Sequence, residues 1–394
     1  MNETIVSVAV IEHVGGHGGM DYYDVGLCRG LLAAGCRVSL YTCDETADPG
    51  VATLRFRPVY GRLFASRSRW MRAWRFLKGL TVALGNAVVR REKVCHFHFF
   101  EHALPELAEV TLARLYGRKI VATVHDVEPL GGNQKTSRHA RIYRHVDRLI
   151  VHNNASLEEL VKLGVDRAKI SVIPHGNYLD KVPASINSVE ARSALGIRQN
   201  AKVALFFGQI KQVKGLDLLI RAIADISREI EEVTLLVAGR PWRVEFSQYD
   251  RLIDELGIRD RCVLHLRYIP DSEVHLYYGA ADIVVLPYRE VYQSGVVLMA
   301  MSYGRPVLVS DLPGMTAVVT EGDNGYVFRQ GSATSLAQAL TRAFQDGQER
   351  QRMTEGALEY VRRNHDWNEI GKQTVELYRA VLLLGRAEGW RKTP

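Results

Sequence analysis

Two lysines follow a glycine turn in the second half of the chain, where an apolar run at residues 203–207 ends. Gly208 and Gln209 open the turn, and Lys211 and Lys214 come before the next helical segment at residues 216–228. Cations beside a helix amino terminus can neutralise a diphosphate without a metal ion. We therefore expect this turn to hold a nucleoside diphosphate; the alternative is that both lysines are solvated loop residues.

A second candidate anion site lies at residues 286–295, between the apolar run 283–286 and the helical segment 296–303. Ser294 and Gly295 would place backbone N–H groups at the amino end of that helix, where proteins bind phosphate. Glu290 could accept hydrogen bonds from sugar hydroxyls, unless it is only a surface acid beside a capped helix. The predicted donor-binding residues are Gly208, Gln209, Lys211, Lys214, Arg240, Glu290, Gln293, Ser294 and Gly295.

A glycine-rich turn at residues 15–19 follows the first apolar run, at residues 5–11, and precedes a helical segment at residues 21–34. Glycines permit positive φ angles and a close approach of ligand to backbone. Because ligands bind at the carboxyl ends of parallel strands, we expect Gly16, Gly18 and Gly19 to contact an acceptor or a phosphate; the alternative is that the glycines form a tight turn alone. The spacing differs from G-x-G-x-x-G, which disfavours a nicotinamide dehydrogenase.

Histidines occur where predicted strands end. His125 closes the apolar run 119–125 and precedes Asp126, a position at which a catalytic role competes evenly with that of a structural, hydrogen-bonded histidine. His96 and His98 lie two residues apart on a neighbouring predicted strand, so His98 is a further candidate at the acceptor. A zinc site needs at least three protein ligands, and none completes this pair, so we predict no metal site.

The positive charge of the chain is concentrated in one segment. The formal net charge is +7, but residues 53–100 contain eleven lysines and arginines and one acid, Glu92. Aromatic residues alternate with arginines at helical spacing, as in helices that lie on anionic membranes, unless the tryptophans belong to the core. No nucleic-acid-binding module accompanies this charge. The predicted membrane-binding residues are Arg67, Arg69, Trp70, Arg72, Trp74, Arg75 and Lys78.

The length of 394 residues is sufficient for two hydrophobic cores. The first apolar run lacks the basic flank and cleavage site of a signal peptide, and no run of ~20 apolar residues predicts a spanning helix. The five cysteines are odd in number and lack CxxC spacing, which is typical of reduced thiols in the cytosol. We expect a cytoplasmic protein attached peripherally to the inner face of the cell membrane.

Strand and helix signals alternate in two successive series. This alternation predicts an α/β protein with two parallel sheets, each in a Rossmann-like domain. The pattern weakens between residues 177 and 200, which we interpret as a linker. The predicted domains are residues 1–180 and residues 195–365.

Together the motifs resemble glycosyltransferase family 4 and its relatives of the GT-B fold, over nearly the whole chain. Residues 94–98 (VCHFH) and 121–126 (VATVHD) are similar to that family's histidine-bearing strands, and residues 173–176 (IPHG) match the stretch before its linker. Asp366-Trp367 and the helix reaching Tyr378 resemble its C-terminal tail. The resemblance implies two domains facing a central cleft, with residues 370–394 crossing back onto the N-terminal domain.

The resemblance also implies a function. The N-terminal domain would bind the acceptor and the C-terminal domain a nucleotide-sugar, with no cofactor and no metal. The catalytic residues would be His125 near the anomeric carbon, with Lys211 and Lys214 at the leaving diphosphate. We expect a hexosyltransferase that uses GDP-mannose or a UDP-hexose and a lipid-linked glycan acceptor in the synthesis of a bacterial-type surface polysaccharide or glycolipid.

Three positions depart from the family pattern. Gln209 stands where the family has arginine, and Val291 and Met299 stand where it has paired glutamates, which places the chain in a divergent subgroup. The departures leave open the donor base, the donor sugar and whether the anomeric configuration is retained or inverted. Two other functions also stay open: a sugar-nucleotide epimerase of the same fold, and a non-catalytic nucleotide-sugar binder.

Overall fold

The computed structural model describes residues 5–16, 19–63, 65, 68–100, 103–127 and 142–390, and the chain divides into two compact units. The first unit is Met1–Gly176 together with His365–Pro394, and the second is Asn177–Asn364. Each unit contains one parallel sheet with helices between its strands, which confirms the predicted α/β class.

The sheet of the first unit has its strands in the order β3-β2-β1-β4-β5-β6-β7, and all neighbouring pairs are parallel. The strands are β1 (Ser7–Ile11), β2 (Arg37–Cys43), β3 (Arg55–Tyr60), β4 (Val94–Phe99), β5 (Lys119–Val124), β6 (Arg148–Val151) and β7 (Ile170–Val172). The strand order reverses between β1 and β4. In open α/β sheets, ligands bind at the carboxyl edge beside such a reversal.

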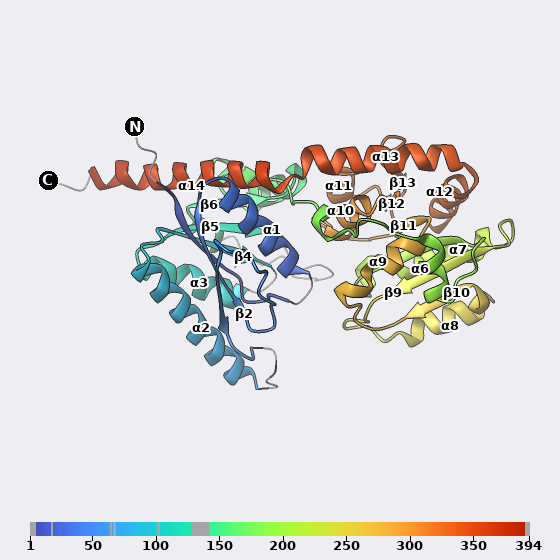
Figure 1. Cartoon of the computed structure of the whole chain (residues 1–394), viewed down its shortest axis with the longest axis horizontal. Helices are drawn as coiled ribbons and strands as arrows, with labels where there is room; N and C mark the ends of the chain where they lie inside the picture. Colours follow the sequence, from blue (N-terminus) through green and yellow to red (C-terminus); the bar gives the residue numbers. More distant parts are fainter. Residues whose placement is uncertain are drawn as a thin grey trace. The chain divides into compact units, whose positions relative to one another are not determined.

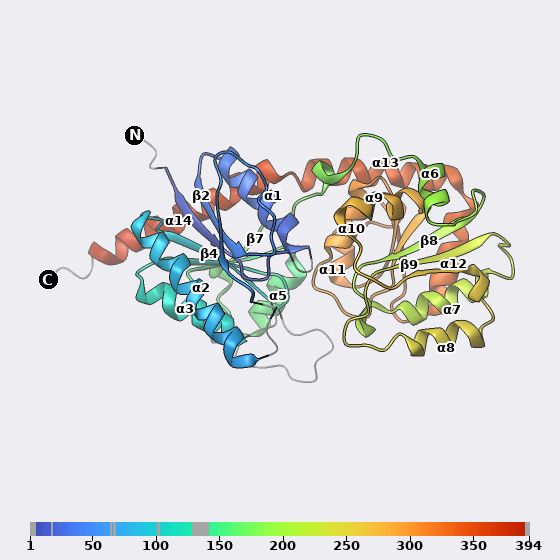
Figure 2. The same ribbon diagram turned by 60° about the horizontal axis from the view of Figure 1, so that its bottom comes forward.

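Helices cover both faces of this sheet, with α1 and α14 on one face and α2 and α3 on the other (Figures 1 and 2). The helices are α1 (Met20–Ala33), α2 (Arg69–Val89), α3 (Ala103–Leu115), α5 (Asn154–Lys162), the 3-10 turn η1 (Arg167–Lys169) and α14 (Trp367–Trp390). Apolar residues from β1, β4, α1 and α14 form one buried cluster. The last helix of the chain therefore completes the core of the first unit.

Glycines allow α1 and α14 to touch through their backbones. A Cβ atom on Gly371 would lie 2.2 Å from the carbonyl of Gly30, and one on Gly30 would lie 2.0 Å from the carbonyl oxygen of Trp367. The indole of Trp367 occupies the space beside Gly26 and Gly176, where an added Cβ would come within 2.2 Å and 2.1 Å of its ring. The predicted return of the C-terminal helix to the N-terminal domain is confirmed.

The sheet of the second unit has the order β10-β9-β8-β11-β12-β13, again fully parallel. Its strands are β8 (Lys202–Phe207), β9 (Val233–Ala238), β10 (Cys262–His265), β11 (Ile283–Leu286), β12 (Val307–Ser310) and β13 (Tyr326–Phe328). The order reverses between β8 and β11. The turns after these two strands are the two candidate anion sites identified in the sequence.

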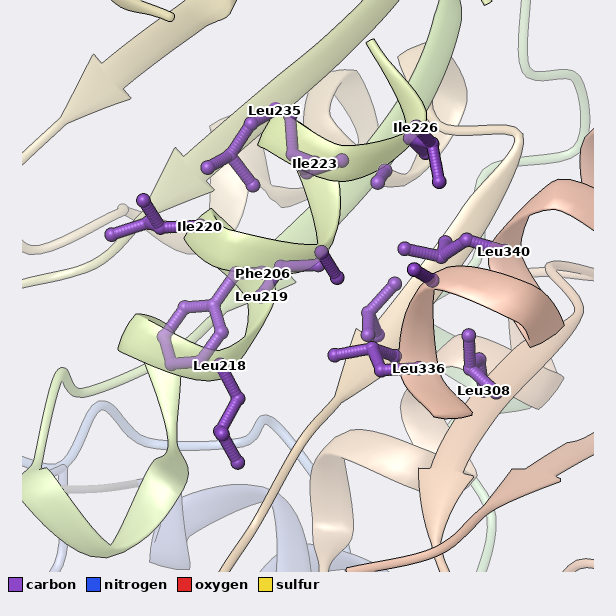
Figure 3. Close-up of a cluster of buried hydrophobic side chains, with 14 of the residues drawn as sticks. Phe206, Leu218, Leu219, Ile220, Ile223, Ile226, Leu235, Leu308, Leu336 and Leu340 are labelled. Atoms are coloured by element: carbon purple, nitrogen blue, oxygen red, sulfur yellow. The ribbon is translucent and has the colours of Figure 1, made fainter. Parts of the chain in front are cut away.

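The core of the second unit lies where α7 and α12 pack against the sheet (Figure 3). Ile223 of α7 and Leu340 of α12 belong to this cluster with Phe206 of β8. The helices are α6 (Ser188–Ala194), α7 (Leu216–Ile226), α8 (Ser247–Glu255), α9 (Asp271–Ala280), α10 (Gly295–Ser302), α11 (Pro313–Thr316), α12 (Ala333–Gln345) and α13 (Gly347–Asn364), with 3-10 turns η2 (Leu179–Lys181), η3 (Gln212–Lys214) and η4 (Arg259–Arg261).

Two features differ from the sequence-based prediction. The interval interpreted as a linker contains η2 and helix α6, whose amino end is capped by the side chain of Asn187. Strand β3 was not predicted, because arginines and Pro58 interrupt its apolar pattern. Its position at the edge of the sheet explains why it tolerates a proline, which cannot donate to a second neighbouring strand.

Candidate active site

A cluster of four histidines, three of them buried and His152 half-buried, lies at the carboxyl edge of the first sheet. The side chains of His98, His125, His152 and His175 come from β4 and from the ends of β5, β6 and β7, and they surround the ring of Tyr23 on α1. The centroid distances from Tyr23 are 5.3 Å to His98, 4.9 Å to His125, 5.5 Å to His152 and 4.9 Å to His175. The imidazole rings of residues on or just after four neighbouring strands therefore lie close together around Tyr23.

These histidines are uncharged at neutral pH. Burial lowers the pKa of His175 to about 3 and that of His152 to about 4. Burial, followed by the neighbouring histidines, also lowers the pKa of His98 and of His125 well below the usual range. Each ring therefore carries one proton and acts through a single donor and a single acceptor nitrogen.

His125 is held on two sides. Its Nε2 atom lies 3.0 Å from Nδ1 of His98, and its ring stacks on Phe100 with centroids 4.9 Å apart. Because Nε2 is engaged by His98, Nδ1 is the nitrogen that can serve a ligand. Asp126, the next residue, is half-buried at the same edge.

The glycine turn after β1 is closed by a residue that the sequence reasoning did not identify. The buried carboxylate of Glu12 accepts hydrogen bonds from the backbone N–H groups of Val14 at 2.6 Å and Gly15 at 2.5 Å. Gly15 has a φ of 56°, and a Cβ atom there would meet Cys43 Sγ at 2.3 Å. These amides therefore serve the turn itself rather than a ligand.

The remaining residues predicted for the glycine turn have different positions. A Cβ atom on Gly16 would lie 2.9 Å from the carbonyl oxygen of Glu45, and Gly19 precedes α1 with a φ of 82°. Gly18 lies outside the described residues. Gly16 is thus needed for close packing against the segment after β2.

His96 has a structural role. Its Nδ1 lies 2.6 Å from the hydroxyl of Tyr378 on α14, and its Nε2 lies 2.8 Å from Thr123 Oγ1 on β5. Both ring nitrogens are therefore engaged within the core. Within the part of the chain that the structure describes, no three His, Cys, Asp or Glu side chains are grouped to hold a metal ion.

In the second unit, two glycines let the ends of β8 and β9 approach each other. Gly208 has a φ of 101° and Gly239 a φ of 151°. A Cβ atom on Gly239 would lie 1.9 Å from the carbonyl oxygen of Gly208, so no larger residue fits without a shift. A Cβ atom on Gly208 would lie 3.3 Å from the ammonium nitrogen of Lys214, which therefore lies against the turn.

Lys214 combines a charge with a poorly hydrated position. Its ammonium lies 5.2 Å from the ring centroid of Tyr288, in the turn after β11. Burial lowers its pKa to about 8. An amine held in this way favours an anion beside it, because the anion restores the stabilisation that water no longer provides.

The two turns predicted to bind the donor contact each other directly. The guanidinium of Arg289 contacts both carboxylate oxygens of Asp217, at 2.8 Å and 2.7 Å, and its backbone N–H donates to the carbonyl of Val213. A Cβ atom on Gly215 would lie 2.0 Å from the carbonyl oxygen of Pro287. The turn after β11 is therefore fixed against the turn that bears Lys214.

The other predicted donor residues lie around these turns. Gln209, Lys211, Gln293 and Ser294 are half-buried, Gly295 begins α10, and Glu290 is exposed. Arg240 follows β9 and is exposed, with its guanidinium 5.6 Å from the ring centroid of Trp242. The bridge between Ile210 and Pro241 brings Arg240 to the same sheet edge as Gly208.

The sequence motifs did not identify two histidines of the cluster, His152 and His175, as site residues. A signal for them exists, because the segments LIVH and VIPH each place a histidine directly after an apolar run. His125 likewise follows a largely apolar run, whereas His98 lies inside β4, one residue before its end. Repetition of one residue type at successive strand ends predicts a cluster, since these ends share one edge of a parallel sheet.

Two family models divide the chain between them. Residues 17–181 match the Glycosyltransferase Family 4 model, and residues 187–360 match the model of Glycosyl transferases group 1. A D-inositol 3-phosphate glycosyltransferase of Xylanimonas cellulosilytica is 27% identical over 398 residues, which cover 92% of each chain. The enzyme of the same name from Corynebacterium urealyticum is 32% identical over 250 residues, 61% of this chain and 58% of that relative.

Solved structures show the same fold. Sucrose-phosphate synthase from Thermosynechococcus elongatus superposes with a TM-score of 0.78 at 20% identity, covering 96% of this chain and 100% of that one. Anabaena HepE in complex with UDP-glucose gives a TM-score of 0.76 at 18% identity, over 95% and 99% of the two chains. The chain belongs to the family 4-like glycosyltransferases of the GT-B fold, as the sequence motifs predicted.

Proposed function

We propose that this glycosyltransferase transfers a hexosyl group from a UDP-hexose or GDP-mannose to a lipid-linked glycan acceptor, without a metal ion. The observation that carries the proposal is the environment of Lys214. Its ammonium group is desolvated and lies beside the backbone of Gly208, which has no side chain. It also lies near the ring of Tyr288, in the turn that leads into α10. A diphosphate between these groups would meet a cation and backbone amides at a helix amino terminus.

The chemistry requires charge stabilisation at the leaving group. The bond between the anomeric carbon and the diphosphate oxygen breaks, and negative charge develops on that oxygen while the sugar becomes oxocarbenium-like. Preorganised donors at the position of developing charge contribute the largest share of rate in such reactions. Lys214, Lys211 and the amides of Ser294 and Gly295 are proposed for this role, and His125 for the orientation of the reacting sugar or acceptor.

An amphipathic face on α2 supports a membrane-bound acceptor. Trp70 and Trp74 are 88% and 58% exposed, so the alternative that they belong to the core is wrong. The exposed basic residues Arg69, Arg72 and Lys78 share this helix. Arg67 lies outside the described residues. None of the described helices is long and apolar enough to cross a membrane, so attachment through this face is proposed to be peripheral.

The neighbouring helix also exposes apolar side chains. Leu104 and Leu107 at the start of α3 are exposed, and α3 packs beside α2 (Figure 2). Apolar side chains interleaved with cations are the pattern of helices that bind anionic lipid surfaces. The proposed setting is the inner face of a cell membrane, in surface polysaccharide or glycolipid synthesis.

The test measures release of nucleoside diphosphate. Thermal-shift titration with UDP, GDP and ADP first identifies the base, since the tightest ligand stabilises the fold most. The matching nucleotide-sugar is then incubated with lipid-linked glycan acceptors and with inositol phosphate, the acceptor class in the names of two relatives. We expect nucleoside diphosphate release that depends on a lipid-linked acceptor.

Each alternative gives a different result. An epimerase would convert the donor sugar without any acceptor, and a non-catalytic binder would be stabilised by the nucleotide with no turnover. Transfer to inositol phosphate but to no lipid-linked acceptor would refute the proposed acceptor class and leave the transferase activity in place.

A further inference from the structure

The partner of the Lys214 ammonium is an aromatic ring. The ammonium nitrogen lies 5.2 Å from the ring centroid of Tyr288, within the range of a cation–π interaction. Within the described ranges of the chain, this ammonium makes no hydrogen bond and no ion pair, and burial alone shifts its pKa. Among these residues, the ring of Tyr288 is therefore the group that stabilises the charge before a ligand binds.

The acid that follows Lys214 closely in the chain is paired elsewhere. Both carboxylate oxygens of Asp217 accept hydrogen bonds from the guanidinium of Arg289, at 2.8 Å and 2.7 Å. A carboxylate on Lys214 would occupy its N–H donors and compete with a diphosphate for the same charge. The face of an aromatic ring attracts a cation through its quadrupole and leaves those donors available.

The residues on either side of Tyr288 fix the position of its ring. The backbone N–H of Arg289 donates to the carbonyl of Val213 at 2.7 Å, and a Cβ atom on Gly215 would lie 2.0 Å from the carbonyl oxygen of Pro287. The side chain of Tyr288 is buried. The backbone on each side of the tyrosine is thus held against the backbone on each side of the lysine.

The hydroxyl group of Tyr288 takes no part in this arrangement. It is buried and makes no hydrogen bond to any residue that the structure describes. Burial of an unpaired hydroxyl group is unfavourable, so phenylalanine should replace this tyrosine without loss. The aromatic face is the part of the side chain that acts on the lysine.

We propose that Tyr288 is a positioning residue whose ring holds the ammonium of Lys214 beside Gly208 and leaves its N–H donors to the diphosphate of the nucleotide-sugar. Tyr288 acts through Lys214 and does not itself bind the donor. The inference rests on the proposed function for the identity of the anion. The contact between ammonium and ring is a property of the protein alone.

A double-mutant cycle tests whether Tyr288 acts through Lys214. Calorimetry with UDP, GDP or ADP, whichever stabilises the wild type most, measures affinity for wild type, Tyr288→Leu, Lys214→Met and the double variant. We expect Tyr288→Leu to weaken binding about 3–30-fold when Lys214 is present, as for loss of a desolvated cation–π contact, and by less than about twofold in the Lys214→Met background. Equal losses in the two backgrounds would overturn the proposal.

Two further variants separate the ring from the hydroxyl group and from general packing. Tyr288→Phe should bind within about twofold of wild type, because it retains the aromatic face. The matched control is Tyr326→Leu, since the buried ring of Tyr326 at the start of β13 lies 5.0 Å from the guanidinium of Arg342. Its affinity should equal that of wild type. A loss in either variant as large as that in Tyr288→Leu contradicts the proposed role.

A second experiment detects the contact in the free protein. In 1H–13C spectra of lysine-labelled protein, the ring current of an aromatic face shifts the ε-methylene protons of a lysine above it upfield, and the Lys214→Met variant identifies the signal. We expect the upfield shift in wild type and in Tyr288→Phe, and its loss in Tyr288→Leu. An unshifted signal in the wild type would refute the contact.

The outcomes distinguish this inference from the proposed function. If Tyr288→Leu does not fold, as judged by its melting curve, Tyr288→Met replaces it in the cycle and the wild-type spectrum still decides on the contact. Wild-type affinity of Lys214→Met for the nucleoside diphosphate would refute the proposed donor site, whereas the upfield shift would still show that Tyr288 holds the ammonium.

Discussion

At the scale of single residues, the surroundings of Lys214 are the strongest feature of the proposed donor site. The family pattern provides an arginine and two glutamates near the donor, and here Gln209, Val291 and Met299 occupy those positions. Lys214 lies against Gly208 and the ring of Tyr288, with a pKa lowered by burial. A desolvated ammonium interacts more strongly with phosphate than a solvated one does, because the effective dielectric constant around it is lower.

Replacement of Lys214 should affect the chemical step. We expect Lys214→Ala to lower turnover at least ~100-fold, within the range for loss of one transition-state donor. The measurement is nucleoside diphosphate release at saturating donor. Lys202→Ala is the matched control, because Lys202 is half-buried at the opposite end of β8. Near-normal turnover of the Lys214→Ala variant would exclude the proposed role.

The pKa of about 8 for Lys214 predicts a pH dependence of binding. A bound diphosphate stabilises the protonated amine and therefore raises its pKa. Affinity should be constant below about pH 8 and fall above it, by up to tenfold per pH unit, until the pKa of the complex is reached. Calorimetric titration with the preferred nucleoside diphosphate between pH 7 and 9 measures this change.

The control for the pH prediction is Lys214→Arg, since arginine stays protonated throughout this range. The affinity of this variant for the nucleoside diphosphate should stay constant over the pH range in which the affinity of the wild type falls. Equal slopes in the two proteins would show that Lys214 is not the titrating group.

At the scale of elements, α2 has a buried face and an exposed face, and both carry large apolar side chains. Phe76 and Leu80 face the core, whereas Trp70 and Trp74 face outward among arginines. The exposed face adds nothing to the core of the unit, so its apolar side chains indicate a binding surface.

The α2 face predicts salt-dependent binding to vesicles. The double variant Trp70→Ala/Trp74→Ala should bind vesicles of phosphatidylglycerol and phosphatidylcholine at least ~10-fold more weakly than wild type in a sedimentation assay, because it loses two apolar side chains. Leu115→Ala is the control, since Leu115 is 76% exposed at the far end of α3. Absence of wild-type binding at low salt would refute the attachment.

The contact between α1 and α14 depends on glycine. We expect Gly371→Ala to destabilise the protein by about 1–3 kcal/mol or more, because the new Cβ atom would overlap the backbone of Gly30. Gly85→Ala is the matched control: a Cβ atom there meets nothing within 4 Å, so higher helix propensity should stabilise α2 by about 0.5–1 kcal/mol. Urea denaturation measures both, and equal effects would contradict this description of the crossing.

At the scale of the whole molecule, elements with a local sequence pattern could be predicted, whereas contacts between residues distant in the sequence could not. The two parallel sheets were predictable because strands such as β9 and β11 are buried on both faces and have nearly continuous apolar sequences. Strand β3 was not predictable, because a strand at the edge of the sheet tolerates arginine and proline, which interrupt the apolar pattern. The contacts of His98 with His125 and of His96 with Tyr378 join residues far apart in the sequence, so no local pattern contains them.

The second unit should fold without the first. Residues 177–364 are continuous in sequence and include a complete sheet and core. We expect this fragment to show a cooperative melting transition and to bind nucleoside diphosphates with the base preference of the full chain. Residues 1–176 should instead remain partly unfolded, because α14 supplies Ile370, Val375 and Tyr378 to their core.

Addition of a peptide of residues 365–394 to the fragment 1–176 provides the check. Recovery of a cooperative transition would support completion of the core by α14. A fragment 1–176 that melts cooperatively by itself would show that α14 is dispensable.

The return of α14 also imposes an order of events on the ribosome. The strands of the first unit emerge first, but α14, which covers one face of their sheet, is synthesised only after residues 177–364. At 5–20 residues per second, the interval is roughly 10–40 s, during which the face around Leu27 and Leu31 lacks its partner. We therefore expect a nascent chain of this protein to expose an apolar surface until α14 has emerged, and a chain released before α14 to keep that surface exposed.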